Sequence, residues 1–188
     1  MENVFEPKLL KDFPSNIRCF DTYAFHSLAV TEDNRLLGWG GNKYSQIKTS
    51  PTKMFFKPVE IPHTIKSPIV DVKCGSTHSL LLTADGDIYA WGKNSQSQLG
   101  QDFIFADSCG TPSPIAAPKD TFFDQIIAAC DFNFAKSVFL SFLNVTNLTY
   151  YFDIFYLQQK KVRFTVGDLR PIIRSLMWQA ANAKRPLC

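Results

Sequence analysis

Two stretches of the chain share one pattern of apolar and polar positions. In each, an apolar run leads into a short polar turn and then a second apolar run that ends in Trp-Gly. The copies are HSLAVTEDNRLLGWGGN over 26–42 and HSLLLTADGDIYAWGKN over 78–94, offset by 52 residues without a gap. An internal repeat of this length is typical of solenoids and propellers, in which each unit buries its faces against its neighbours.

Each copy predicts a β-hairpin. In the second copy the turn falls at Asp85-Gly86, and Asp-Gly supplies the positive φ angles of a tight hairpin turn. Asp33-Asn34 is expected to do the same in the first copy at a higher cost. Because the apolar runs are continuous, both faces of each sheet must be covered. The pattern therefore predicts an all-β fold of face-packed sheets.

A third, weaker unit follows at an offset of 56 residues, which aligns Cys74 with Cys130 and His78 with Phe134. Units are expected to start near Pro7, Pro58 and Pro114. The repeat region is predicted to span 1–140, followed by a divergent apolar and basic tail over 141–188. A helix is expected over 168–184. It is interpreted either as a docking helix that covers an open blade edge or binds a partner groove, or as a foreign or misjoined terminus.

The motifs resemble the repeat of the regulator of chromosome condensation family, GxxHSLALTxxGxVYxWGxNxxGQLG, over roughly residues 7–140. The second copy carries the resemblance in Gly75-Ser76-Thr77-His78-Ser79, Trp91-Gly92-Lys93-Asn94 and Gln98-Leu99-Gly100. The resemblance implies a bladed β-propeller, with seven blades in complete members, that binds proteins and in some members regulates small GTPases. The structural repeat positions are His26, Trp39, Gly40, Asn42, Gly75, His78, Asp85, Gly86, Trp91, Gly92, Asn94 and Gly100.

Some positions depart from the family pattern. Tyr23 and Asp131 stand where the second copy has Gly75, and Ser45 and Ser97 replace the family glycine before Gln-Leu-Gly. If these positions need a left-handed backbone, each non-glycine residue costs about 1–2 kcal/mol, and Tyr23 is the least comfortable. Each repeat histidine is expected to bond a neighbouring backbone group and so pin its blade.

The number of units raises a question of closure. Propellers close with about four to eight blades, and this chain supplies between two and three. Terminal blades would expose unpaired strands or apolar faces. The hypotheses are a fragment, a truncated product, or a protomer that closes by self-association.

Charge gives no strong nucleic-acid signal. The net charge is +3, but residues 1–140 hold 13 basic and 15 acidic side chains, and 141–188 hold 7 and 2. Phosphate binding needs a clustered positive field, which the repeats do not predict. The basic tail is interpreted as a solvated face, in preference to a patch for anionic lipid or nucleic acid.

The cysteines and the first residues favour a cytoplasmic or nuclear protein that is not secreted. The five cysteines contain no Cys-x-x-Cys pair, so reduced thiols are expected, with Cys74 and Cys130 packed in the core. Residues 1–12 lack the apolar region of a signal peptide. The sequons at Asn144 and Asn147 are then accidental. Polar residues interrupt the apolar stretch 138–157, so a strand-rich or poorly packed segment is favoured there over a membrane span.

No catalytic, cofactor-binding or metal-binding residues are predicted. Cys74-x-x-x-His78 is not repeated as a pair, and the glycines at 38–41 end a strand instead of opening a helix. The leading hypothesis is a non-enzymatic protein-interaction module that uses the loops 43–57 and 101–118. The alternatives are a guanine-nucleotide exchange factor for a small GTPase and an incomplete fragment without independent function.

Overall fold

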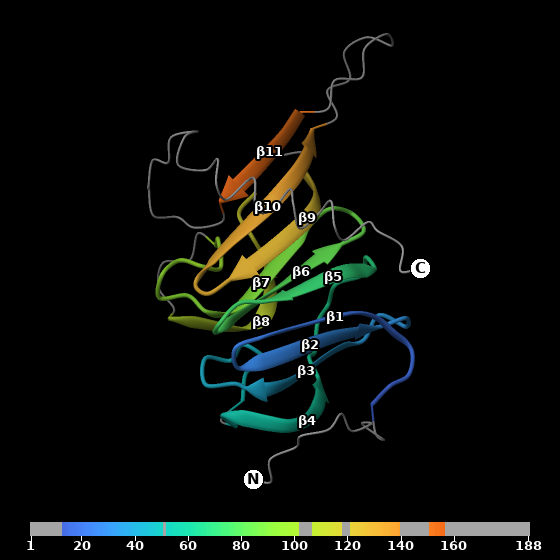
Figure 1. Ribbon diagram of the computed structural model, residues 1–188, viewed down its shortest axis with the longest axis vertical. Helices are drawn as coiled ribbons and strands as arrows, with labels where there is room; N and C mark the ends of the chain where they lie inside the picture. The colour runs from blue at the N-terminus through green and yellow to red at the C-terminus, as the bar shows by residue number, and fades with distance from the viewer. Residues whose placement is uncertain (1–12, 51, 102–106, 118–120, 140–150, 157–188) are drawn as a thin grey trace, which may run out of the picture.

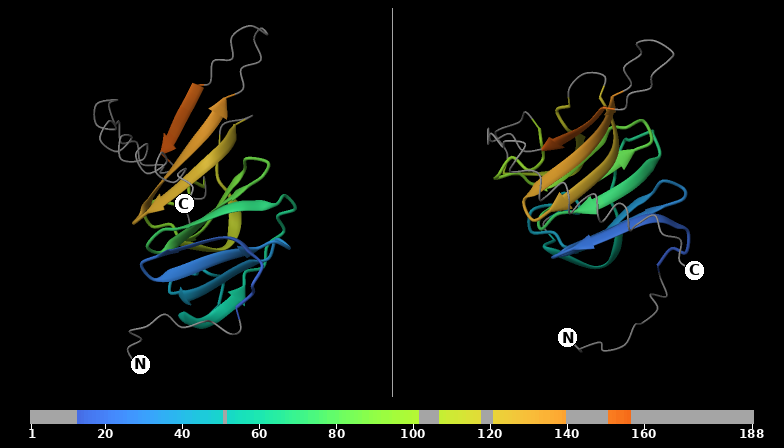
Figure 2. Two further views of the ribbon diagram at one scale, coloured as in Figure 1. Left: turned by 45° about the vertical axis from the view of Figure 1, so that its right-hand side comes forward. Right: turned by 45° about the horizontal axis from the view of Figure 1, so that its top comes forward.

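The computed structural model describes residues 13–50, 52–101, 107–117, 121–139 and 151–156. These residues form eleven β-strands in three antiparallel sheets. The sheets stack face to face in chain order, with the first at the bottom of Figure 1 and the third at the top. Figure 2 shows the same succession from two other sides. The chain is an all-β partial propeller, as the repeat predicted.

The first two sheets are four-stranded blades in which each strand pairs with the next along the chain. The first blade consists of β1 (Ile17–Tyr23), β2 (His26–Thr31), β3 (Leu36–Gly41) and β4 (Met54–Glu60). The second consists of β5 (Ile69–Cys74), β6 (His78–Thr83), β7 (Ile88–Lys93) and β8 (Ser108–Pro114). Because β1 and β5 contact each other across the sheets, β4 and β8 form the outer edges.

The third sheet has three strands in the order β11-β10-β9. They are β9 (Phe122–Ala129), β10 (Phe132–Phe139) and β11 (Tyr151–Tyr156), the last of which comes from the tail. The helix predicted over 168–184 and the sequons at Asn144 and Asn147 lie outside the described residues. Within the part of the chain that the structure describes, no helix has the length and hydropathy needed to cross a membrane.

Each hairpin turn uses one left-handed residue. Asn34 has φ 67° and Gly86 has φ 81°, whereas Asp33 and Asp85 do not have positive φ. The prediction that both residues of each pair take positive φ was therefore wrong for the aspartates. The amides of Asn34 and Gly86 bond the threonine carbonyls three residues earlier, at 2.9 and 3.0 Å. This is a type I turn followed by a left-handed residue, a common three-residue hairpin loop.

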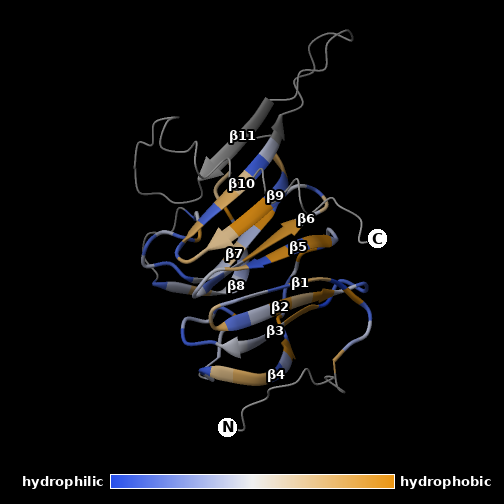
Figure 3. Ribbon diagram, viewed as in Figure 1, coloured by the Kyte–Doolittle hydropathy of each residue, from blue (hydrophilic) through white to orange (hydrophobic). Residues whose placement is uncertain are grey.

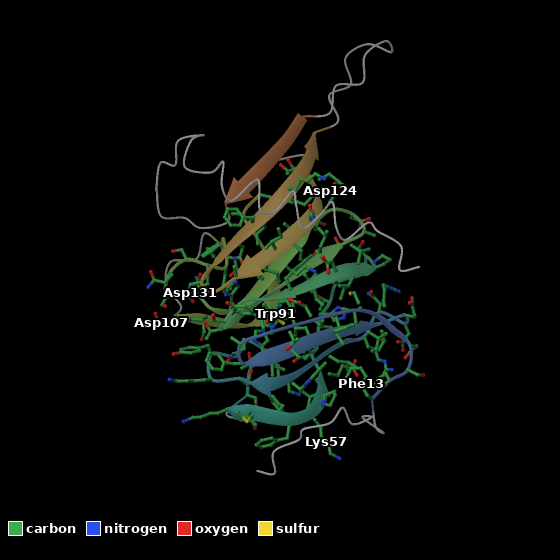
Figure 4. All side chains as sticks on the ribbon, viewed as in Figure 1. Phe13, Lys57, Trp91, Asp107, Asp124 and Asp131 are labelled. Atoms are coloured by element: carbon green, nitrogen blue, oxygen red, sulfur yellow. The ribbon has the colours of Figure 1, made fainter. Side chains whose placement is uncertain are left out.

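The core lies between the sheets, and β6 is buried on both faces. Leu81 packs toward the first blade, while Leu80 and Leu82 pack toward the third sheet. Figure 3 shows β5, β6 and β9 as the most hydrophobic strands. Figure 4 shows Trp91 in this stack, and its side chain is fully buried in the cluster that joins the first two blades. Trp39, at the same repeat position, is half-buried and meets Phe13 edge-on at 5.3 Å between ring centres.

The register of the third sheet differs from the prediction. Each inner strand carries one bulged residue, at Arg18 in β1, Val70 in β5 and Asp124 in β9. The second and third bulges are 54 residues apart, so the predicted offset of 56 was two residues too long. The true equivalents of Cys74 and His78 are Ala128 and Phe132.

Cys130 therefore does not share the buried position of Cys74. Cys74 is buried at the end of β5, whereas Cys130 is exposed in the turn between β9 and β10. The prediction that both pack in the core holds for Cys74 and was wrong for Cys130.

Candidate functional site

A buried hydrogen-bond relay joins the first blade to the second. His26 begins β2, and its Nε2 lies 2.9 Å from the hydroxyl of Ser79 in β6. That hydroxyl donates to the main-chain carbonyl of Gln46, at 2.7 Å, which returns the relay to the first blade. Because the Ser79 hydrogen is used in this bond, the hydroxyl accepts from His26, and the imidazole carries its proton on Nε2.

The same relay recurs between the second blade and the third sheet. His78 Nε2 lies 2.6 Å from Asn133 Oδ1, and Asn133 Nδ2 donates to the main-chain carbonyl of Gln98 at 2.6 Å. Asn133 follows Phe132 as Ser79 follows His78. The histidines were expected to bond backbone groups. That prediction was wrong, because their partners are side chains of the next sheet.

Burial keeps both relay histidines neutral. It lowers the pKa of His26 to about 4, with a smaller contribution from nearby His78. It also lowers the pKa of His78, which the Asn133 hydrogen bond only partly offsets. The Nδ1 atoms of both imidazoles are buried without a hydrogen-bond partner. Each histidine therefore acts as a buried, neutral hydrogen-bonding group that holds two adjacent sheets in register.

Gly75 is needed for space under the His78 ring. A Cβ atom at Gly75 would collide with that imidazole. Neither Gly75 nor Tyr23 has positive φ, and neither does Ala129, which the corrected offset of 54 residues places at this position in the third unit instead of Asp131. The strain expected at Tyr23 was therefore absent, and the left-handed residue of that turn is Ala24, at φ 49°.

The glycine after each repeat tryptophan has a different role. Gly40 and Gly92 have φ 96° and 105°, and a Cβ at either would meet a main-chain carbonyl at 2.5 or 2.7 Å. The carbonyls belong to Phe25 and Thr77, just before the repeat histidines. Only glycine allows this close approach, so the Trp-Gly pair fixes the end of the blade where the β3–β4 and β7–β8 loops begin.

Repeat asparagines organise these two loops. Asn42 donates from Nδ2 to the carbonyls of Lys48 and Thr52, and its Oδ1 accepts from the amides of Ile47 and Lys48, all at 2.9–3.1 Å. Asn94 accepts from the amide of Leu99 at 3.2 Å in the same manner. The family glycine position does take the left-handed conformation in both loops, since Ser45 and Ser97 each have φ 58°.

The β3–β4 loop also contacts the second blade. The amide of Thr49 donates to the carbonyl of Gly110 in β8 at 3.0 Å, so the β3–β4 loop packs on the second blade. Gly100, with φ 58°, closes the second loop by accepting from the amide of Ala116 at 2.8 Å. The β3–β4 and β7–β8 loops thus begin at the same end of adjacent blades. The prediction that all of 43–57 and 101–118 is loop was wrong, because 54–57 belong to β4 and 108–114 form β8. Residues 102–106 and 118 lie outside the described residues.

The described residues of the site form structural hydrogen bonds and an exposed loop surface, and they bring no group of metal-ligating side chains together. Within the described residues, no three His, Cys, Asp or Glu side chains converge as metal ligands would. The relay partners Ser79, Asn133, Gln46 and Gln98 were missed from the sequence. Two signals were available, because Gln46 recurs as Gln98 and Ser27 recurs as Ser79 at the repeat offset.

Comparison with protein families finds the same repeats. Two models of the regulator of chromosome condensation (RCC1) repeat match the chain. One matches residues 17–46 and 69–98, and the other matches 33–82 and 85–135.

Curated relatives match over part of the chain. The ultraviolet-B receptor UVR8 of Arabidopsis thaliana is 35% identical over 75 residues, which are 40% of this chain and 17% of the receptor. Human protein RCC2 is 38% identical over 77 residues, which are 41% of this chain and 15% of RCC2. The chain thus spans less than a fifth of the length of either relative.

Solved structures show the same fold. Prp20p from Saccharomyces cerevisiae, described together with its binding to Gsp1p and histones, superposes with a TM-score of 0.56 at 22% sequence identity. The match covers 65% of this chain and 33% of the yeast protein. At that identity the likeness establishes the propeller architecture and nothing about activity.

Proposed function

Since this chain belongs to the family built from regulator of chromosome condensation repeats, we propose that it is a non-enzymatic interaction module that binds another protein. Its binding surface is formed by the β3–β4 and β7–β8 loops. The observation that carries the proposal is a constant framework with variable side chains at one end of adjacent blades. Prp20p, which has the same fold, is described together with its binding to Gsp1p and histones.

The framework and the variable positions can be separated by comparing the two loops. Asn42 and Asn94 make equivalent bonds to the loop backbone. Gln46 and Gln98 each accept, through Oε1, from the amide two residues earlier at 2.9 Å. Between these fixed points the first loop has Lys43-Tyr44 and the second has Ser95-Gln96. A rigid backbone that displays different side chains in each blade is suited to recognition, because loop residues carry specificity on such scaffolds.

Site-specific photocrosslinking tests the proposal. A benzoylphenylalanine is placed at Ser95, in the exposed β7–β8 loop, and in a second variant at Ala84, in the exposed β6–β7 turn at the opposite end of the blade. The expected result is that a captured partner crosslinks at Ser95 and not at Ala84. Crosslinking at Ala84 alone, or a folded protein that crosslinks to nothing, would overturn it.

Guanine-nucleotide exchange on a small GTPase is the second candidate, and the family resemblance is its support. An exchange factor used in substoichiometric amounts accelerates release of labelled nucleotide, whereas a scaffold binds without changing the release rate. We also infer a cytoplasmic or nuclear location, supported by the four described cysteines, Cys19, Cys74, Cys109 and Cys130, which are free thiols.

A further inference from the structure

The β3–β4 region is basic without internal carboxylates. From residue 34 to residue 59 the chain has five basic side chains and no acidic one, with Asp33 and Glu60 at the borders. The basic residues are Arg35, Lys43, Lys48, Lys53 and Lys57. The remainder of the repeat region is richer in acids than in bases, so the positive charge is concentrated on this part of the first blade.

Two of these charges meet at one aromatic ring. The ammonium of Lys43 lies 5.2 Å from the centre of the Tyr44 ring, and that of Lys93 lies 5.4 Å from the same centre. Lys93 ends β7, so the pair is contributed by adjacent blades. A third ammonium, that of Lys48, lies 5.4 Å from the Phe55 ring. Each such contact contributes about 0.5–1 kcal/mol at an exposed site. Two ammonium groups from adjacent blades therefore share the Tyr44 ring.

These lysines lack a counter-charge in the described part of the chain. The ion pairs found there join Arg18 to Glu32, Arg35 to Asp33, Lys73 to Asp71 and Lys136 to Asp124. None of them engages Lys43, Lys48 or Lys93. Figure 4 places Asp107 near the second blade's outer strand, and its main-chain carbonyl accepts from Asn94. Asp107 thus marks the acidic border of the basic cluster.

The cluster is preorganised, and its blade also exposes apolar side chains. Tyr44 follows Asn42 in the loop that this asparagine holds together, and its own amide donates to Gln46 Oε1 at 2.9 Å. A fixed loop reduces the entropy lost on binding. On the same blade, Met54 and Phe56 of β4 are 46% and 77% exposed. A ligand that satisfies this surface combines anionic groups with apolar side chains.

We propose that the Lys43–Tyr44–Lys93 cluster binds an acidic segment of a partner protein, with carboxylates pairing with the two ammonium groups and an apolar side chain packing on exposed Met54 or Phe56 of the same blade. This inference rests on the proposed function and names the chemistry of its partner. A protein ligand is favoured over nucleic acid because the positive field is short, is bordered by Asp107, and belongs to a blade that also exposes apolar side chains. Nucleic-acid binding needs basic residues along an extended backbone.

The test uses fluorescence anisotropy with the whole chain and a labelled peptide of alternating glutamate and phenylalanine. The expected result is saturable binding that weakens at least tenfold in the Lys43→Ala/Lys93→Ala variant. The matched control is Lys66→Ala/Lys73→Ala, which removes the same charge elsewhere and should change affinity less than twofold. Tyr44→Leu keeps every charge but loses the ring, and should weaken binding three- to tenfold.

Three outcomes overturn the inference. Equal losses in the two double variants would mean that net charge alone attracts the peptide. Tighter binding of a duplex DNA of equal charge would assign the cluster to nucleic acid. If the peptide does not bind a chain that circular dichroism shows to be folded, the inference of an acidic-segment site is wrong. The proposal that the chain is an interaction module would still be tested separately by crosslinking at Ser95.

Discussion

The two junctions between successive sheets have the same geometry but differ in chemistry. At the first, one hydroxyl, that of Ser79, both accepts from a histidine and donates to a glutamine carbonyl. At the second, the amide of Asn133 divides these tasks between its oxygen and its nitrogen. The junction therefore requires an acceptor and a donor at one position and not a particular residue, so a repeat can vary there without losing its register.

The junctions also differ in the space beside the histidine. At the second junction the His78 ring lies over Gly75, and at the first the equivalent residue is Tyr23, 42% exposed, whose hydroxyl lies 3.3 Å from Cys130 Sγ. Tyr23 thus reaches from the first blade to the third sheet. The position tolerates a large side chain where the histidine leaves room, and it excludes even a methyl group where the histidine fills the space.

Gly75→Ala is expected to cause the largest loss of stability among the changes that test this comparison. The new methyl group must displace the His78 ring, which overpacks the turn and breaks the bond to Asn133, so unfolding free energy should fall by about 4 kcal/mol. Urea denaturation measures it. The matched variant Tyr23→Ala should cost less than about 0.5 kcal/mol, because it removes one exposed contact. Equal costs would mean that the His78 ring does not depend on Gly75 for its place.

The second-largest effect is expected from acid, which should weaken the junction between the first and second blades. The folded pKa of His26 is about 4, below the ordinary value of 6.5, so its contribution to stability is complete above pH 6.5 and is lost as the pH falls from 6.5 to 4. The loss amounts to about 3 kcal/mol, since one pKa unit corresponds to about 1.4 kcal/mol. Denaturation curves across this range measure it. The His26→Gln variant cannot gain the proton, so its unfolding free energy should depend less on pH. If the pH dependence of that variant is unchanged, other groups cause the acid sensitivity.

The third-largest losses of stability are expected from substitutions of the relay partners Asn133 and Ser79. Asn133→Ala leaves the His78 N–H and the Gln98 carbonyl unpaired, and Ser79→Ala does the same to His26 and the Gln46 carbonyl. Each should cost about 2 kcal/mol in unfolding free energy. Asn133→Ser, which imports the chemistry of the first junction, should recover part of the loss. If it is as damaging as alanine, side-chain length matters more than the ability to donate and accept.

The sequence predicted the features that each repeat unit contains within itself. The hairpins, Trp91, Gly92 and the blade stack follow from an apolar pattern that recurs at constant spacing. Contacts between units were predicted less well. Asn133 was missed because the third unit begins two residues earlier than the assumed offset, which also assigned Cys130 to the core. The lysines that meet at Tyr44 lie 50 residues apart, so only the stacking of the blades brings them together.

One feature of the blades does not differ between the junctions, and it gives the smallest expected effect. Ser45 and Ser97 both have φ 58°, and their amides bond the carbonyls of Asn42 and Asn94 at 3.1 and 2.8 Å. Glycine relieves about 1–2 kcal/mol of strain but loses about 0.5–1 kcal/mol through greater freedom in the unfolded chain. Ser45→Gly and Ser97→Gly should therefore each raise the unfolding free energy by about 0.5 kcal/mol, measured by urea denaturation. The alanine variants keep the strain and should show no gain, so a gain with alanine would attribute the effect to the lost hydroxyl instead of the backbone. A gain at only one position would show that the two loops, although equal in backbone, are not equally strained.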